Sequence, residues 1–169
     1  DLDAPDYKLV IEQGVLAINQ QLEEKTRSLG SAVRRSGMDE VNACRAAIYA
    51  CDALMQLAQN LATSAEKLAA TETNAYRKAE LSESAAILHH IPARPARSFK
   101  EACQAFYLFQ LALQLDNGSY AVNPEGADKA LLAYYQHDIA NGLLTEAQAY
   151  EIVECLWFKL AELSEVRAA

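Results

Sequence analysis

The sequence predicts a mainly α-helical chain with about six helices and one short strand. Apolar residues recur at the 3.6-residue period of an α-helix along most of the 169 residues. The segments with this period begin and end at helix-capping or helix-breaking residues. One further apolar run lies outside them and has strand character. Together these observations predict the mainly helical fold class.

Three helices are predicted in the N-terminal half of the chain. The first covers about residues 5–29, with a proline in its first turn and Gly30 directly after its end. The second follows a polar loop and covers about residues 39–70, which gives it a length of about 50 Å. The third covers about residues 74–90 and is stopped by Pro92.

Three more helices are predicted in the C-terminal half. Ser98 and Glu101 form a capping box that opens the fourth helix. This helix is apolar on nearly every side, so we expect it to be covered on nearly every side. The fifth covers about residues 127–140, and the sixth begins at Thr145, whose capping-box partner is Gln148.

Residues 115–123 (LDNGSYAVN) have strand or turn character, and the chain offers no second strand candidate. A strand without a partner cannot satisfy its own backbone donors and acceptors. We therefore expect residues 1–169 to be one segment of a larger domain, with the rest of that domain pairing with the strand and covering the fourth helix. An oligomer is the alternative source of these contacts. In either case we expect the chain to self-associate through the fourth helix or the strand edge.

Composition excludes several classes of protein. The formal net charge of −8 argues against nucleic-acid binding, because contacts to phosphates need a basic face. No run of about 18 apolar residues occurs, so no membrane-spanning segment is predicted, and we see no signal-peptide pattern. Cys44, Cys51, Cys103 and Cys155 lie in predicted helices without a CxxC pair. We expect buried free thiols, no metal site and a cytoplasmic location.

Two clusters of polar residues are candidates for chemistry. His89 and His90 are adjacent on a helix and point to different sides, so we expect them to favour the helix C-terminus and not to bind a metal. Arg94, Arg97 and Lys100 form a small basic cluster. A structural ion pair or an acidic protein partner is one interpretation of it, and a substrate carboxylate or phosphate is the other. Taken alone, the residues show no catalytic motif.

Several segments, in this order and spacing, resemble the pyruvate formate-lyase domain of glycyl radical enzymes, and most of all its dehydratase-like branch. The resemblance extends over essentially the whole chain. Its segments are APDY (4–7), ACDA (50–53), PARPARSFKEA (92–102), QAF (104–106), YY (134–135), DI (138–139), GLLT (142–145) and ECLWFKL (154–160).

The resemblance implies a ten-stranded α/β barrel wrapped by helices, of which this chain would be an N-terminal-half fragment: the helical shell and one barrel strand at about 115–123. It also implies a glycyl radical, installed by an S-adenosylmethionine iron–sulfur activating enzyme, and a thiyl-forming cysteine. The family's cysteine and glycine motifs do not occur here, so no catalytic residue and no cofactor are expected in this chain. Its partners would be the rest of the barrel, a small-molecule substrate and further copies in a homo-oligomer.

The resemblance also indicates where substrate would bind. Aligned on the dehydratase-like pattern NGHSxSPGR, the substrate-facing pair falls on Tyr120 and Ala121, and aligned on the pattern NGAA it falls on Ser119 and Tyr120. The arginine of the family's PGRxD is missing from residues 124–128 (PEGAD), so the substrate class stays open. Alternatively, Tyr120 packs on a neighbouring strand.

Two functions are therefore expected from the sequence. The first is a fragment of a glycyl radical lyase, dehydratase or formate acetyltransferase, in which a radical abstracts hydrogen from a small polar metabolite. The alternative is a non-catalytic helical module that binds another protein.

Overall fold

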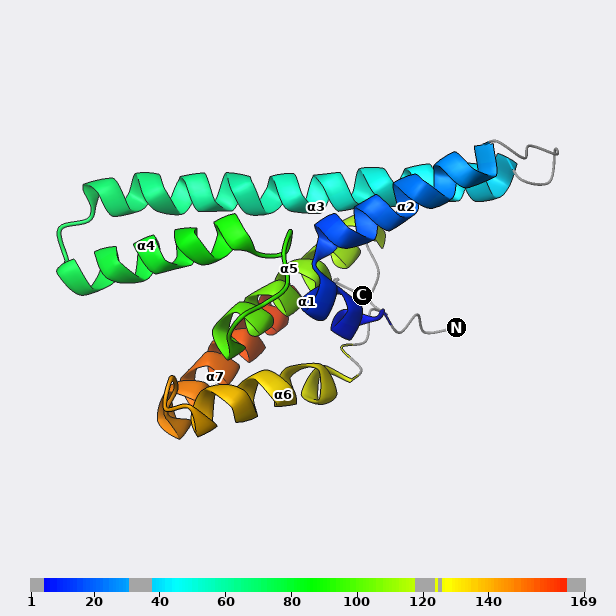
Figure 1. Ribbon diagram of the computed structural model, residues 1–169. Coiled ribbons are helices and arrows are strands. Elements are labelled where there is room, and N and C mark those ends of the chain that lie inside the picture. The colour runs from blue at the N-terminus through cyan, green and yellow to red at the C-terminus, as the bar shows by residue number, and fades with distance from the viewer. Residues whose placement is uncertain (1–4, 31–37, 118–123, 125, 164–169) are drawn as a thin grey trace, which may run out of the picture. The chain divides into compact units, whose positions relative to one another are not determined.

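The computed structural model describes residues 5–30, 38–117, 124 and 126–163. Within these ranges every regular element is an α-helix, so the mainly helical class is confirmed (Figure 1). The expected six helices and one strand are a wrong count, since seven helices and no strand occur in the described residues. The helices are α1 (Tyr7–Gln13), α2 (Val15–Gly30), α3 (Met38–Thr71), α4 (Ala75–His90), α5 (Phe99–Asn117), α6 (Ala127–Ala140) and α7 (Glu146–Glu162).

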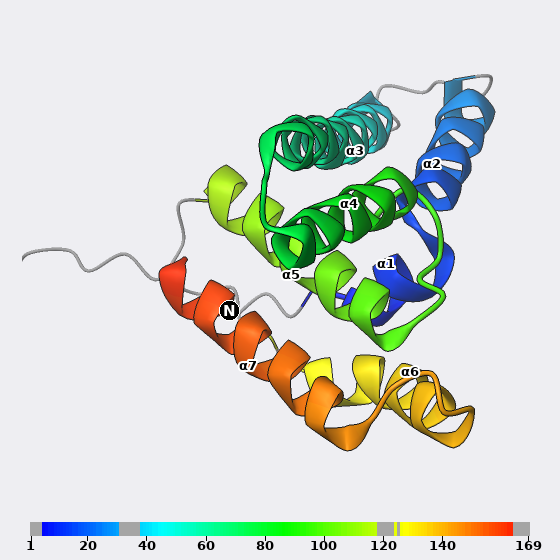
Figure 2. The same ribbon diagram turned by 90° about the vertical axis from the view of Figure 1, so that its left-hand side faces the viewer.

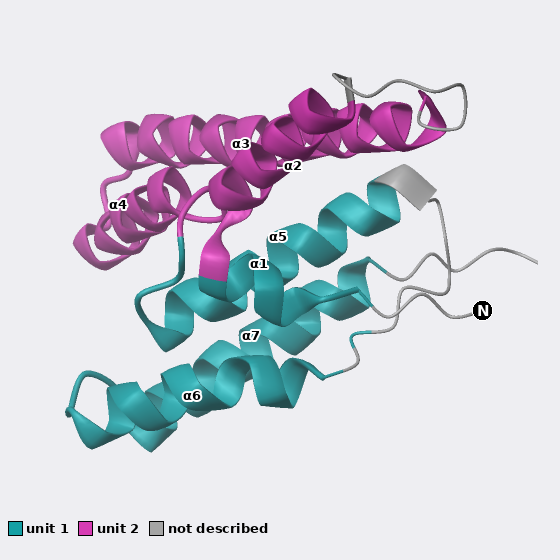
Figure 3. Cartoon of the chain, turned by 45° about the vertical axis from the view of Figure 1, so that its right-hand side comes forward, with its two compact units in different colours: residues 1–12, 95–169 teal, residues 13–94 magenta. Residues whose placement is uncertain are grey.

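The helices belong to two compact units (Figure 3). Unit 1 contains residues 1–12 and 95–169, and so holds α1, α5, α6 and α7. Unit 2 contains residues 13–94 and holds α2, α3 and α4. No helix in the described part of the chain combines the length and the hydropathy that crossing a bilayer requires.

The predicted helix at 5–29 is two helices, because the chain breaks at Gly14. This glycine has a φ of +76°, which an uninterrupted right-handed helix does not allow. The break lets Val15 donate its N–H to the carbonyl oxygen of Pro92 at 2.8 Å. A Cβ at position 14 would lie 2.6 Å from the carbonyl oxygen of Ala93. A returning segment distant in sequence therefore terminates the first helix.

The predicted strand at 115–123 is wrong in its first three residues. Helix α5 continues to Asn117, because Leu115 extends the helical spacing of Leu108 and Leu111 by one more turn. Residues 118–123 lie outside the described residues.

Unit 2 is built around the 34-residue helix α3, which has α2 along one part of its length and α4 along another (Figures 1 and 2). Its bounds agree with the helix predicted at 39–70. Small residues line the contact with α4: Ala62, Ala65 and Ala69 are buried on α3, and Ala85 is buried on α4. Short side chains let two helix backbones approach closely, and Leu88 is the large apolar residue that α4 buries beside Ala85.

Unit 1 is built around α5, against which α6 and α7 pack (Figure 3). The fourth predicted helix is covered in its first half, where Ala102, Ala105, Phe106 and Leu108 are at most 1% exposed, whereas Leu111 and Leu113 are half-buried and Leu115 is 69% exposed. Part of this cover comes from the ring of Tyr7 in α1, and so from the chain itself.

At both predicted capping boxes, the side chain of the N-cap residue makes the expected hydrogen bond. Thr145 and Gln148 form the expected capping box at the start of α7. At the start of α5, the hydroxyl of Ser98 accepts the backbone N–H of Glu101 at 3.2 Å. The carboxylate of Glu101, however, accepts the backbone N–H of Arg97 at 2.7 Å.

The four thiols are free, as expected, but they are not all buried. Cys44 and Cys103 are buried, Cys51 is half-buried and Cys155 is exposed. The expectation is wrong for Cys155. The buried Ala149 marks the side of α7 that packs on the rest of unit 1, and helical spacing places Cys155 on a different side.

Candidate functional site

The substrate-binding residues expected from the resemblance, Ser119, Tyr120 and Ala121, lie outside the described residues. The structure describes the two helices on either side of them: α5 ends at Asn117 and α6 begins at Ala127. The candidate site is therefore the connection 118–126, and its observable geometry is that of the helices to which this connection is attached.

A buried aromatic cluster holds α5 against α1. The ring of Tyr7 stacks on Phe106 with a centroid separation of 4.3 Å and meets Phe109 edge-on at 5.6 Å. Its hydroxyl donates a hydrogen bond to Oε1 of Gln110. Burial raises the pKa of Tyr7 to about 12, so the phenol keeps its proton and acts as a donor. This cluster fixes the helix two turns before the candidate site.

A buried carboxylate holds the other helix. Asp138, near the end of α6, is 3% exposed, and its Oδ2 accepts the backbone N–H of Phe99 at 2.8 Å. Its Oδ1 lies 3.0 Å from Nδ1 of His137. A negative charge at the N-terminus of α5 is favoured by the unpaired N–H groups and the helix dipole. The Phe99 ring also meets Tyr135 edge-on at 5.7 Å, which adds an apolar contact between α5 and α6.

One residue of the basic cluster before α5, Arg97, forms a structural ion pair with Glu101. The guanidinium of Arg97 donates from Nε to Oε1 of Glu101 at 3.1 Å, and this hydrogen bond raises the pKa of Arg97. Glu101 is 5% exposed, so its charge needs this partner. The ion-pair interpretation is confirmed for Arg97.

His89 binds the neighbouring helix. Its Nδ1 lies 2.9 Å from Oε1 of Gln59, and its Nε2 lies 2.8 Å from Oε1 of Glu66. His89 and His90 lie in the last turn of α4, as expected, and the ring of His89 is held there by acceptors from α3. No cluster of three or more potential metal ligands occurs among the described residues.

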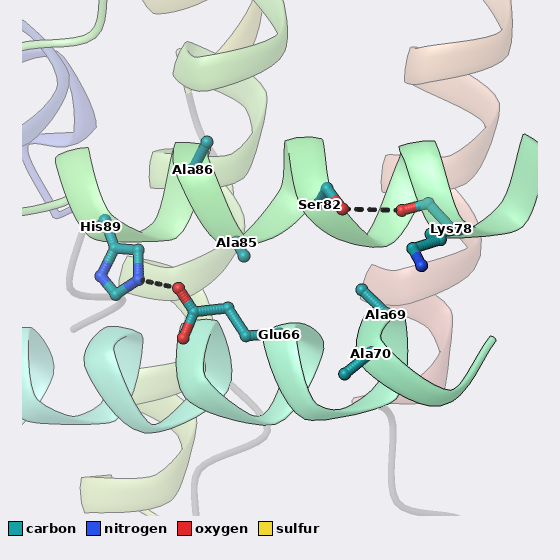
Figure 4. Close-up of a pocket in the computed structure, with 8 residues that line it drawn as sticks. All are labelled: Glu66, Ala69, Ala70, Lys78, Ser82, Ala85, Ala86 and His89. Atoms are coloured by element: carbon teal, nitrogen blue, oxygen red, sulfur yellow. Dashed lines mark hydrogen bonds and ion pairs between the residues drawn. The ribbon is translucent and has the colours of Figure 1, made fainter. Parts of the chain in front are cut away.

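The same histidine lines an open pocket of about 410 Å³ between α3 and α4 (Figure 4). Its inner wall includes the buried Ala69 and Ala85. His89 is held by Glu66, and the hydroxyl of Ser82 donates to the carbonyl oxygen of Lys78 at 2.9 Å. These polar groups are engaged within the helix pair, so the pocket does not present a reactive constellation.

Three of the described glycines have structural roles at helix boundaries. Gly14, Gly126 and Gly142 take positive φ values at helix boundaries. Each therefore has a local structural reason to be glycine. Cys103 is buried within α5, and this burial raises its pKa to about 12. We derive no reaction step through a glycyl radical or a thiyl radical on these residues.

The family model named pyruvate formate lyase-like matches residues 4–169. The chain belongs to the pyruvate formate lyase-like family. This places it among the glycyl radical enzymes, as its sequence segments indicated. It is 33% identical over 162 residues to the isethionate sulfite-lyase of Bilophila wadsworthia, and the match covers 95% of this chain and 20% of that relative.

Solved structures support the same family assignment. The glycerol-bound B12-independent glycerol dehydratase from Clostridium butyricum superposes with a TM-score of 0.90 at 26% identity, over 98% of this chain and 21% of the dehydratase chain. A structure concerning 1,2-propanediol dehydration in Roseburia inulinivorans gives a TM-score of 0.81 at 30% identity, over 97% of this chain and 20% of its own. This pyruvate formate lyase-like chain thus spans about a fifth of the length of these proteins.

Sequence reasoning missed the two anchors of the site. The sequence predicts Tyr7 in the apolar stripe of the first helix and Asp138 at the start of a helix–helix turn, but it does not predict their contacts with α5. No signal in the sequence connected Tyr7 with Gln110, which lies 103 positions away.

Proposed function

We propose that this chain is part of the helical shell of a longer, cytoplasmic glycyl radical enzyme, a lyase or dehydratase that acts on a small polar metabolite. The observation that carries the proposal is the family match over residues 4–169, together with the relatives' roughly fivefold greater length. The alternative, a non-catalytic interaction module, would not explain why the match to an enzyme family extends over residues 4–169.

In this proposal the chain contributes positioning and substrate contacts. Tyr7 and Asp138 fix α5 and α6, and these two helices hold the connection that carries Ser119, Tyr120 and Ala121. These three residues are proposed to contact substrate. The glycyl radical, installed by an S-adenosylmethionine iron–sulfur activating enzyme, would lie in the part of the enzyme outside this chain and would supply hydrogen abstraction.

The first experiment uses the full-length enzyme that contains this chain, activated anaerobically by its activating enzyme. A glycyl-type doublet in the electron paramagnetic resonance spectrum is expected, followed by turnover of one substrate among isethionate, 1,2-propanediol and glycerol, the compounds that the relatives' names suggest. Activation of residues 1–169 alone should give no doublet. The absence of a radical in the full-length enzyme would contradict the proposal.

The second experiment tests the substrate contacts. Tyr120→Phe in the full-length enzyme removes one hydroxyl, and the loss of a hydrogen bond to substrate should raise KM about tenfold. Thermal stability should not change. The matched control is Tyr76→Phe, because Tyr76 is 73% exposed on α4 and should leave KM unaltered. An unchanged KM in Tyr120→Phe would favour the alternative, that this tyrosine only packs on a neighbour.

A further inference from the structure

Helix α7 exposes three large aromatic side chains within nine residues. Tyr150 is 67% exposed, Trp157 is 60% exposed and Phe158 is 72% exposed. The exposed tyrosines of unit 2, Tyr49 and Tyr76, stand singly on α3 and α4. Isolated exposed apolar residues are common on proteins, whereas a group of aromatic residues on one helix is typical of an interface.

These three residues form one face of the helix, which we call the aromatic face of α7. Trp157 follows Tyr150 by two helical turns, so both lie on the same side, and Phe158 lies one residue further around. The opposite side of α7 contains Ala149, which is buried, and Leu156, which is half-buried. The helix is therefore apolar on two sides, and α5 accounts for only one of them.

The aromatic face has acidic neighbours and no cation of its own. By helical spacing, Glu154 lies between Trp157 and Phe158, and Glu151 lies beside Phe158. Both carboxylates are on exposed residues. The basic residue of the described α7 is Lys159, whose Nζ lies 2.7 Å from Glu162. The face thus offers aromatic surface and uncompensated negative charge together.

We propose that the aromatic face of α7 docks a segment of the same enzyme that lies outside this chain and presents apolar side chains flanked by lysine or arginine. The inference rests on the proposed function, because it requires that residues 1–169 belong to a longer polypeptide. Two observations select this occupant. The relatives are about five times as long as the chain, and basic groups are electrostatically complementary to the acidic neighbours of the face.

A second copy of the same face is a poor match for this surface. An interface formed by this face of two copies about a two-fold axis would contain the carboxylates of Glu151 and Glu154 from both copies. The chain as a whole carries a net charge of −8, which adds to that repulsion. A basic segment instead neutralises the carboxylates while its apolar side chains cover the rings.

The test is hydroxyl-radical footprinting of the full-length enzyme, read by mass spectrometry of its peptides. Tyr150, Trp157 and Phe158 should lose reactivity, relative to the urea-unfolded enzyme, as fully as the buried Phe106 does. Reactivity of the three rings near that of the unfolded enzyme would overturn the proposal.

Carbodiimide cross-linking identifies the occupant. Glu151 or Glu154 should be linked to a lysine of the same polypeptide outside residues 1–169, and a mixture of isotopically light and heavy enzyme should give no mixed pairs. Mixed pairs would mean that a second copy occupies the face, and cross-links to the activating enzyme alone would mean a transient partner. Either result would overturn the proposal.

Charge reversal supplies the matched pair of variants. Glu154→Lys should lower the melting temperature of the full-length enzyme, whereas Glu24→Lys on the exposed side of α2 should not. Equal melting temperatures for the two variants would overturn the proposal. Failure of this proposal can be told apart from failure of the proposed function. An enzyme that forms the glycyl radical but leaves the three rings of α7 reactive to hydroxyl radicals refutes only the docking. An enzyme with protected rings and no glycyl radical refutes only the function.

Discussion

The carboxylate of Asp138 accepts the backbone N–H of Phe99 at 2.8 Å, so the last turn of α6 caps the first residue of α5 across 39 positions of sequence. The backbone carbonyl oxygen of the same aspartate accepts the N–H of Leu143 at 2.9 Å. One residue thereby connects the start of α5, the end of α6 and the turn that leads to α7.

Asp138→Ala should destabilise the protein by about 1–3 kcal/mol, because it leaves a buried N–H of α5 without its acceptor. Asp138→Asn is the control: it keeps an acceptor oxygen and removes the charge, so it should cost about 1 kcal/mol or less. Urea denaturation at pH 7 measures both free energies of unfolding. Equal losses for the two variants would mean that the charge, and not the hydrogen bond, is what matters.

Gly14→Ala should destabilise the protein more than Gly126→Ala does. Both glycines have a φ of +76°, so both substitutions carry the same left-handed penalty of about 1–2 kcal/mol. A Cβ at position 14 would also lie 2.6 Å from the backbone of Ala93 and Arg94, whereas a Cβ at position 126 meets nothing within 4 Å. The difference between the two free energies of unfolding therefore measures the contact alone. Equal losses would contradict the close approach.

The parts of this fold that follow local rules could be predicted from the sequence. Helix α6 has the expected bounds, and α7 begins at the expected capping box, because the residues that define them lie within a few positions of one another. The break at Gly14 could not be predicted in this way. It depends on Pro92 and Ala93, and a single glycine in a helical pattern does not reveal a distant segment.

The candidate site was less accessible to sequence reasoning than the fold. Its location between α5 and α6 came from family resemblance, and the strand assigned there fails at Leu115, where the helical period simply continues. The anchors Tyr7 and Asp138 act through contacts more than 35 positions away, which periodicity does not report. The aromatic face of α7 could not be predicted for a related reason. Apolar residues lie on two sides of this helix, and the sequence alone does not show which side packs on α5.

The protein should lose stability as the pH rises above 9. Burial raises the pKa of Cys103 from 9.0 to about 12, so the folded protein keeps a proton that the unfolded chain releases in this range. The stabilisation is fully present below pH 9 and is lost by pH 12, with a loss of about 2 kcal/mol between pH 8 and 11. Urea denaturation across this range measures it.

Cys103→Ala is the control for this pH dependence. The variant should be less stable than the unaltered protein at pH 7 but should show a flatter decline above pH 9, because the titrating thiol is gone. At pH 8 the exposed Cys155 should react with iodoacetamide in the folded protein, and Cys103 should react only after unfolding. An identical decline in both proteins would show that other groups cause it.

Tyr7→Phe should destabilise the protein by about 1–2 kcal/mol, since it keeps the ring contacts with Phe106 and Phe109 but removes the hydroxyl that donates to Gln110. Tyr7→Ala should cost about 3–5 kcal/mol, because it also opens a cavity where the stacked ring lay. Tyr76→Phe on the exposed side of α4 is the matched control and should stay within about 0.5 kcal/mol. The free energies of unfolding at pH 7 separate the hydrogen bond from the packing. If Tyr7→Phe matched the control, the ring alone would hold α1 against α5, and the hydroxyl would contribute nothing to the position of the helix that leads into the candidate site.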